Sequence, residues 1–330
     1  MRVVVTGATG NVGTSALDAL GRDEAVTSIL GIARRLPAAT FAKTEFAAAD
    51  VARDDLAPLL RGADCVVHLA WLIQPSHDEA TLQRTNIEGS QRTFDAVAAA
   101  GVPALVVASS VGAYSPRTDA RPVDESWPTG GIPASWYSRH KAEVERRLDR
   151  LEIDRPDLRV ARLRPAITTK RDAASGQRRL FAGPLLPTAL LRPGWIPFVP
   201  DVPGLTLQLA HSDDVADAYR RAVVSDARGA FNIAGEPLLD PAAIARVLGT
   251  RTLRMPVGVL RGAAHAMWLA HLQPTSPDWI DLALGAPVLD TVRARTELGW
   301  APTRGAAETL REVVAGMREG AGRATPALEP

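Results

Sequence analysis

The stretch Val3–Gly13, VVVTGATGNVG, decides the fold of this 330-residue chain. Three consecutive valines predict a buried parallel strand, glycines follow at positions 7, 10 and 13, and a helix-forming segment, TSALDALGRD, comes next. A strand, a glycine turn and a helix in this order are typical of a dinucleotide-binding fingerprint. Glycines let the backbone approach a pyrophosphate without an intervening Cβ, and the helix offers free N–H groups and its positive dipole end to the phosphates.

The glycine spacing is G-x-x-G-x-x-G rather than the commoner G-x-G-x-x-G. It resembles the T-G-A-x-G-x-x-G motif of the extended short-chain dehydrogenase/reductases, the NAD-dependent epimerase/dehydratase family. The resemblance implies cofactor contacts from the residues of this turn: Gly7, Thr9, Gly10, Asn11, Val12 and Gly13. For the turn taken alone, the alternative is a purely structural bend at the end of a strand.

Composition and charge narrow the class of protein. Hydrophobic residues make up 46% and charged residues 23%, which is ordinary for a soluble globular protein, and a net charge of +1 gives no reason to expect nucleic acid or an anionic membrane as a partner. The single cysteine, Cys65, cannot form an intramolecular disulfide, which fits a reducing cytoplasm. We expect no signal peptide, because the first strand begins at Arg2, and no membrane span, because no run of about 18 apolar residues occurs.

Strand and helix patterns alternate over roughly the first 150 residues, which predicts an α/β fold with a Rossmann-type, doubly wound parallel sheet. A chain of this length exceeds the usual size of one compact core, so a smaller second domain is expected. The predicted division places residues 1–168 and about 206–236 in a dinucleotide-binding domain. Residues 169–205 and 237–320 would form a smaller substrate domain, and residues 321–330 a frayed tail.

The residues after the second predicted strand, TSILGIA, bear on which cofactor is bound. An NAD site usually carries an acidic residue here, which accepts hydrogen bonds from the ribose 2′-hydroxyl. This chain has Arg34 and Arg35 instead, and guanidinium groups pair with a 2′-phosphate. We therefore predict NADP as the cofactor, with NAD as the alternative; the two arginines would in that case be solvent-facing loop residues.

The resemblance implies further cofactor contacts from residues that follow later strands. They are Asp50, Val51, Leu69, Ala70, Asn86, Pro165 and Ile167. In the family, the first two positions contact adenine and the last two line the nicotinamide face; for Asp50 a loop or capping role is the alternative. His68, which precedes Leu69, is expected to be structural, and no metal site is expected because no cluster of ligands accompanies it.

Two further stretches predict a catalytic site. Ser109 and Ser110 follow a strand at its C-terminal end, where open α/β sheets bind ligands, and Tyr137 and Lys141 lie one helical turn apart on the same face. A neighbouring ammonium is expected to lower the pKa of Tyr137 and make it a general acid or base. The resemblance implies that Tyr137 exchanges a proton with the substrate oxygen, that Lys141 also binds the nicotinamide ribose, and that Ser110, with Ser109 as the alternative, hydrogen-bonds the same oxygen.

The departures from the family suggest the substrate. Val111-Gly112 stands where sugar dehydratases carry Asp-Glu, and Leu207 and residues 286–288 stand where nucleotide-sugar epimerases carry arginines that hold a diphosphate. We therefore predict a carbonyl reductase or alcohol dehydrogenase with a less charged small-molecule substrate. The alternatives are an epimerase or dehydratase and a non-catalytic NADP-sensing regulator; the resemblance also allows a homodimer. Four tryptophans are candidates for an apolar pocket or for ordinary packing: Trp71, Trp136, Trp195 and Trp268.

Overall fold

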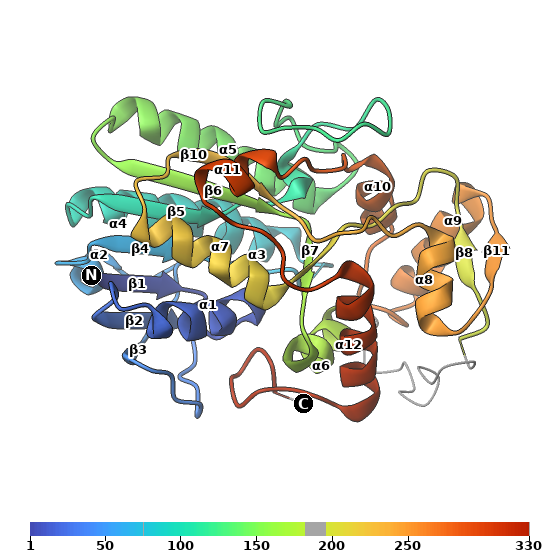
Figure 1. Ribbon diagram of the computed structural model, residues 1–330, viewed down its shortest axis with the longest axis horizontal. Helices are drawn as coiled ribbons and strands as arrows, with labels where there is room; N and C mark the ends of the chain where they lie inside the picture. The colour runs from blue at the N-terminus through green and yellow to red at the C-terminus, as the bar shows by residue number, and fades with distance from the viewer. Residues whose placement is uncertain (75, 182–195, 330) are drawn as a thin grey trace.

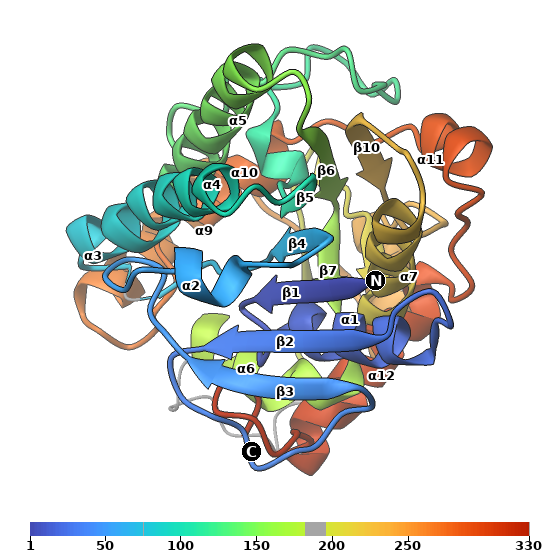
Figure 2. The ribbon, with the colours of Figure 1, turned by 90° about the vertical axis from the view of Figure 1, so that its left-hand side faces the viewer.

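A parallel β-sheet organises the fold; the computed structural model describes residues 1–74, 76–181 and 196–329. Its seven strands lie in the order β10-β6-β5-β4-β1-β2-β3, and each neighbouring pair is parallel (Figure 2). The strands are β1 (Arg2–Thr6), β2 (Ser28–Ala33), β3 (Thr44–Ala48), β4 (Cys65–His68), β5 (Ala104–Ala108), β6 (Arg159–Pro165) and β10 (Gly229–Ile233). The predicted α/β fold with a Rossmann-type, doubly wound parallel sheet is confirmed.

Two pairs of helices cover the faces of the sheet (Figures 1 and 2). They are α1 (Asn11–Arg22) with α7 (Ser212–Val224) on one face, and α4 (Gly89–Ala99) with α5 (Trp136–Asp154) on the other. The valines of β1 explain this layering, because successive side chains of a strand point to opposite faces. Val3 and Val5 belong to the core beneath α1 and α7, whereas Val4 belongs to the core beneath α4 and α5. All three are fully buried, as the apolar run predicts.

The other elements fill the connections and form a lobe beside the sheet. The short strands pair in parallel as β7 (Ile167–Thr169) with β9 (Leu209–His211) and β8 (Val199–Asp201) with β11 (Thr252–Arg254). The remaining helices are α2 (Ala57–Leu60), α3 (Glu79–Gln83), α6 (Ala174–Phe181), α8 (Pro241–Leu248), α9 (Val257–Leu269), α10 (Asp278–Gly285), α11 (Val292–Glu297) and α12 (Ala306–Glu319), with a π-helical turn η1 (Arg84–Glu88) and 3-10 turns η2 (Val111–Ala113) and η3 (Arg171–Ala173). Figure 1 shows α8, α9, β8 and β11 gathered at one end of the molecule. The boundaries of the two domains stay a prediction.

No helix among the described parts of the chain is both long enough and apolar enough to cross a membrane.

The segment after α12 corrects the prediction of a frayed tail. Residues 321–329 fold back as an ordered loop, in which the Arg323 amide donates to the Leu328 carbonyl at 2.9 Å. Thr325 is fully buried and Leu328 is 3% exposed. Terminal residues are expected to fray, but the polar side chains of this segment find partners near the start of the chain, Asp18 in α1 and Thr9 in the turn after β1.

Candidate functional site

The glycine turn joins β1 to α1 in a geometry that only glycine permits at two positions. Gly7 has a φ of 68°, and a Cβ built there would lie 2.7 Å from the Ala70 nitrogen. A Cβ on Gly13 would lie 2.3 Å from the Gly7 carbonyl oxygen. Gly10 is the N-cap of α1 and offers no side chain to the first turn of the helix. The close backbone approach and the uncapped helix start fit a bound pyrophosphate group.

Substituting Gly13 with alanine should therefore destabilise the protein. The new Cβ would meet backbone atoms of Gly7 and Ala8, which cannot rotate away, so we expect a loss at or above the roughly 1–3 kcal/mol typical of overpacking. Gly10→Ala is the matched control, because its Cβ would lie 3.4 Å from the Gly7 oxygen and its φ is −81°. Chemical denaturation of both variants measures the difference; equal stability would contradict the turn geometry.

Two buried side chains, His68 at the end of β4 and Asn86 in η1, make hydrogen bonds close to the glycine turn and to the loop after β4. The ring of His68 is buried between the Thr6 hydroxyl (2.8 Å to Nδ1) and the Ser90 hydroxyl (3.0 Å to Nε2), and burial lowers its pKa to about 3. Asn86 is fully buried, and its side-chain amide accepts from the Leu72 N–H at 2.7 Å and donates to the Leu72 carbonyl at 2.9 Å. These two hydrogen bonds hold the backbone of the loop after β4 in place. The predicted cofactor contact of Asn86 stays a prediction.

The other predicted cofactor residues follow the C-terminal ends of parallel strands, which all meet at one edge of the sheet. They are Arg34 and Arg35 after β2, Asp50 and Val51 after β3, Leu69 and Ala70 after β4, and Pro165 and Ile167 at the end of β6 and the start of β7. Both arginines are exposed, and Arg35 donates to the Pro326 carbonyl at 3.2 Å. One carboxylate oxygen of Asp50 accepts from the Ala52 N–H at 3.0 Å, which is a turn-capping contact.

Ser110, Tyr137 and Lys141 come together at the same edge. Ser110 follows β5, where its hydroxyl accepts from the Gly112 N–H at 3.0 Å and lies near enough to Tyr137 to lower the pKa of that residue. The Lys141 Nζ donates to the Ala108 carbonyl at 2.7 Å and lies 5.9 Å from the centroid of the Tyr137 ring. Gly112 is required beside the tyrosine, since a Cβ there would lie 2.9 Å from Tyr137 Cε1.

The expectation that Lys141 lowers the pKa of Tyr137 is wrong for this structure. Burial raises the pKa of Tyr137 above its ordinary value, and the hydrogen bond with Ser110 offsets this only in part. Burial also lowers the pKa of Lys141 to about 7, with the Glu145 carboxylate acting in the opposite direction. Besides its bond to the Ala108 carbonyl, Nζ contacts the ring of Trp71, whose centroid lies 3.5 Å away.

Aromatic rings surround Tyr137. The centroid of its ring lies 5.1 Å from that of Trp279, 5.8 Å from that of Trp71 and 6.0 Å from that of Trp136. Phe181 packs edge-on against Trp279 at 5.0 Å. Two of the tryptophans proposed from the sequence are therefore next to the tyrosine.

The other two candidate tryptophans differ. Trp268 stacks on His77 with 4.1 Å between ring centroids, and Trp195 lies outside the described residues. Trp279, which sequence reasoning missed, is the second residue of α10, far along the chain, and no motif marks it.

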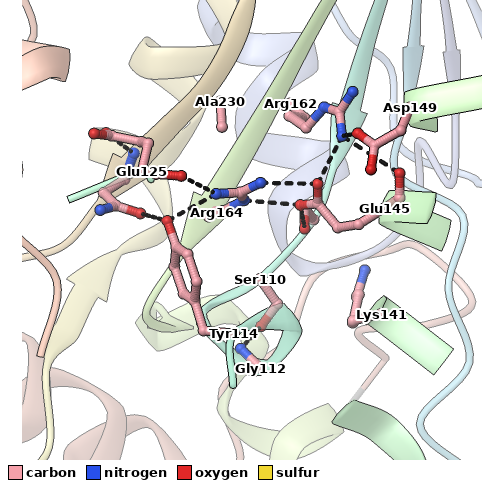
Figure 3. Close-up of polar contacts among 12 residues, drawn as sticks. Ser110, Gly112, Tyr114, Glu125, Lys141, Glu145, Asp149, Arg162, Arg164 and Ala230 are labelled. Carbon is pink, nitrogen blue, oxygen red and sulfur yellow. Dashed lines mark hydrogen bonds and ion pairs between the residues drawn. The ribbon is translucent and has the colours of Figure 1, made fainter. Parts of the chain in front are cut away.

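Sequence reasoning also missed Glu145, which lies one turn beyond Lys141 on α5. Its carboxylate accepts from Arg164 at both oxygens (2.8 and 2.9 Å) and from Arg162 at 2.8 Å (Figure 3). Burial tends to raise the pKa of Glu145, but the hydrogen bond and charge of Arg164, with those of Arg162, outweigh it and lower the pKa to about 2. The Ser109 hydroxyl donates to this carboxylate at 2.5 Å, so Ser109 faces the ion network and Ser110 faces Tyr137.

Comparisons with known proteins agree with this architecture. The sequence model of the NAD dependent epimerase/dehydratase family matches residues 3–167, half of the chain. UDP-glucose 4-epimerase of Mycolicibacterium smegmatis is 29% identical over 330 residues, covering 95% of this chain and 97% of that protein. L-arabinose 1-dehydrogenase (NAD(P)(+)) of Haloferax volcanii is 33% identical over 176 residues, covering 49% of this chain and 65% of that protein.

Among solved structures, a UDP-glucose-4-epimerase from Stenotrophomonas maltophila with bound NAD and formylated UDP-arabinopyranose has the same fold. Its TM-score is 0.72 at 21% sequence identity, with 97% of this chain and 98% of that chain covered.

Proposed function

Because this chain belongs to the NAD dependent epimerase/dehydratase family, we propose that it is an NAD(P)-dependent oxidoreductase of the extended short-chain type, which interconverts a carbonyl and an alcohol. The observation that carries the proposal is the meeting of Ser110, Tyr137 and Lys141 at the C-terminal edge of the sheet. The glycine turn lies at this same edge, after β1. A bound nicotinamide ring would supply or accept the hydride.

Each of the three residues has a distinct part. In reduction, the Tyr137 hydroxyl gives its proton to the carbonyl oxygen while the carbonyl carbon gains a hydride, and oxidation runs the same transfers in reverse. The raised pKa of Tyr137 keeps it protonated at neutral pH, as a proton donor must be. Ser110 hydrogen-bonds the same substrate oxygen and orients it toward Tyr137. Lys141 would donate from Nζ to the nicotinamide ribose of a bound cofactor.

The residues that would hold the cofactor form two groups. The pyrophosphate would lie on the turn of Gly7, Thr9, Gly10, Asn11, Val12 and Gly13, and the other contacts would come from Arg34, Arg35, Asp50, Val51, Leu69, Ala70, Asn86, Pro165 and Ile167. The cradle that a Cβ would fill at Gly7 and Gly13 supports the first group. The position of the two exposed arginines directly after β2 supports NADP over NAD.

The aromatic rings around Tyr137 suggest the substrate. Trp71, Trp136 and Trp279 make the surroundings of the Tyr137 ring apolar, which suits a carbonyl compound with an apolar body. Leu207 and residues 286–288 stand where nucleotide-sugar epimerases carry diphosphate-binding arginines. The second candidate is nevertheless a sugar epimerase, because the relative that shares 29% identity across 95% of this chain bears that name.

The test is a titration of the purified protein with NADPH and with NADH, followed by nicotinamide fluorescence. We expect tighter binding of NADPH, and then net cofactor consumption with an apolar ketone. Interconversion of a UDP-sugar without net consumption of cofactor would favour the epimerase instead. If neither dinucleotide binds, the proposal is wrong.

Removing the arginines tests the cofactor preference. We expect Arg34→Ala with Arg35→Ala to weaken NADPH binding roughly 10- to 100-fold, the worth of a charge-assisted hydrogen bond, and to leave NADH binding unchanged. Arg251→Ala is the control, because Arg251 is an exposed arginine next to β11 in the smaller lobe. An equal loss of affinity for both dinucleotides would show that the arginines do not read the 2′-phosphate.

A further inference from the structure

Residues 321–329, which we call the return segment, contact the elements proposed to bind the adenosine half of the cofactor. The Thr325 hydroxyl donates to the Thr9 carbonyl at 3.0 Å, inside the glycine turn. Thr325 is fully buried, so this bond is shielded from water and the Thr9 carbonyl would be left without it if the hydroxyl were removed. The return segment therefore holds the turn in one conformation.

A second set of contacts anchors the return segment on α1. Arg323 donates to both carboxylate oxygens of Asp18, at 2.7 and 3.2 Å, and its guanidinium lies 4.5 Å from the centroid of the Phe41 ring. A bidentate arginine–carboxylate pair fixes orientation as well as distance. Since α1 begins at the glycine turn, this anchor keeps the return segment in register with the proposed pyrophosphate site.

A third set of contacts reaches the loop after β2. The Ala39 N–H donates to the Ala324 carbonyl at 3.0 Å, and Arg35 donates to the Pro326 carbonyl at 3.2 Å. The bond to Pro326 uses one of the five N–H donors of the guanidinium and leaves the others for an anion. An exposed arginine would otherwise sample many rotamers, so this contact pre-orders Arg35.

We infer that the return segment is a positioning element for the cofactor, which pre-orders the glycine turn through Thr325 and the 2′-phosphate arginine through Pro326. This inference rests on the proposed function, because it requires that the turn and Arg35 bind a dinucleotide. Pre-ordering removes part of the entropic cost of binding, so the segment contributes to cofactor affinity. Its contact with Arg35 adds a contribution that only a 2′-phosphorylated cofactor gains.

Substitution of Thr325 tests the first part. Thr325→Val keeps the shape and removes the donor, and we expect it to raise the Kd of both NADPH and NADH about tenfold, the worth of one hydrogen bond. Thr325→Ser keeps the hydroxyl and should bind both dinucleotides like the wild type. Turnover at saturating cofactor should be unchanged in both variants. A Kd in Thr325→Val equal to that of the wild type would overturn the role of Thr325.

Release of the anchor tests the second part. Arg323→Ala should weaken NADPH binding more than NADH binding, because it frees Arg35 as well as the turn. Arg261→Ala removes an exposed ion pair with Asp281 and serves as the control. An unchanged ratio of the two Kd values in Arg323→Ala would overturn the link to Arg35.

Limited proteolysis of the wild-type protein needs no variant to fold. We expect saturating NADPH to slow tryptic cleavage after Arg323, because cofactor and return segment order the same elements. Cleavage at equal rates with and without NADPH would overturn the inference. If the wild type binds dinucleotides while the variants keep its Kd values, only the positioning role falls; if it binds none, the proposed function falls with it.

Discussion

Tyr137→Phe should fold, bind the dinucleotide with wild-type affinity and lose nearly all turnover. The phenylalanine ring keeps the packing against Trp71 and Trp279, so the site should keep its shape. What disappears is the hydroxyl that exchanges the proton, a contribution of about 10²- to 10⁴-fold in rate. The measurement is kcat with a carbonyl substrate, alongside the Kd of NADPH.

Tyr219→Phe is the matched control for this prediction. Tyr219 is one of only three tyrosines in the chain and is fully buried, and within the described residues its hydroxyl has no hydrogen-bond partner. Its removal should therefore leave kcat unchanged. Wild-type turnover in Tyr137→Phe would remove the mechanism, and an equal loss in both variants would point to general damage of the core.

Much of the fold could be predicted because its signals are local. Three consecutive valines and the glycine spacing identify β1, the turn and α1, and the apolar run VPALVVASS contains β5. The return segment could not be predicted in this way. Its anchors, Asp18 and Thr9, lie more than three hundred positions away in the chain, and no local pattern in the segment marks such partners.

In the candidate site, too, local spacing could be predicted from the sequence, whereas burial and tertiary contacts could not. Helical spacing correctly predicts that Tyr137 and Lys141 share a face, but the direction of the tyrosine pKa depends on burial, which the spacing does not reveal. Glu145 lies four residues after Lys141 and therefore on the same face of α5. Arg162 and Arg164 lie two residues apart in β6, so their side chains point to the same face of the sheet. These two periodicities were the available signal for the ion network. Neither periodicity shows that this face of α5 packs against this face of β6, because that contact depends on the tertiary structure.

The second large effect is expected at Glu145. Glu145→Gln should lower the free energy of unfolding by about 3–5 kcal/mol, the usual cost of leaving a buried charge without its partner. Arg164 is 5% exposed, and its other contacts are the Tyr114 hydroxyl and the Glu125 carbonyl, which carry no charge. Glu143→Gln is the control on the same helix, because its partly exposed pairs with arginines should be worth about 0–1 kcal/mol.

The pH dependence of the free energy of unfolding provides a second test of this prediction. The pKa of Glu145 falls from an ordinary value of 4.5 to about 2 in the folded protein, so folding favours the carboxylate. The stabilisation is therefore complete above pH 4.5 and is lost as the pH falls toward 2. In urea unfolding, the gap between wild type and Glu145→Gln should be constant from pH 7 to pH 5 and should narrow below that. A gap that persists unchanged into strong acid would mean that the glutamine disturbs packing rather than removing the charge that holds Arg164 in the core.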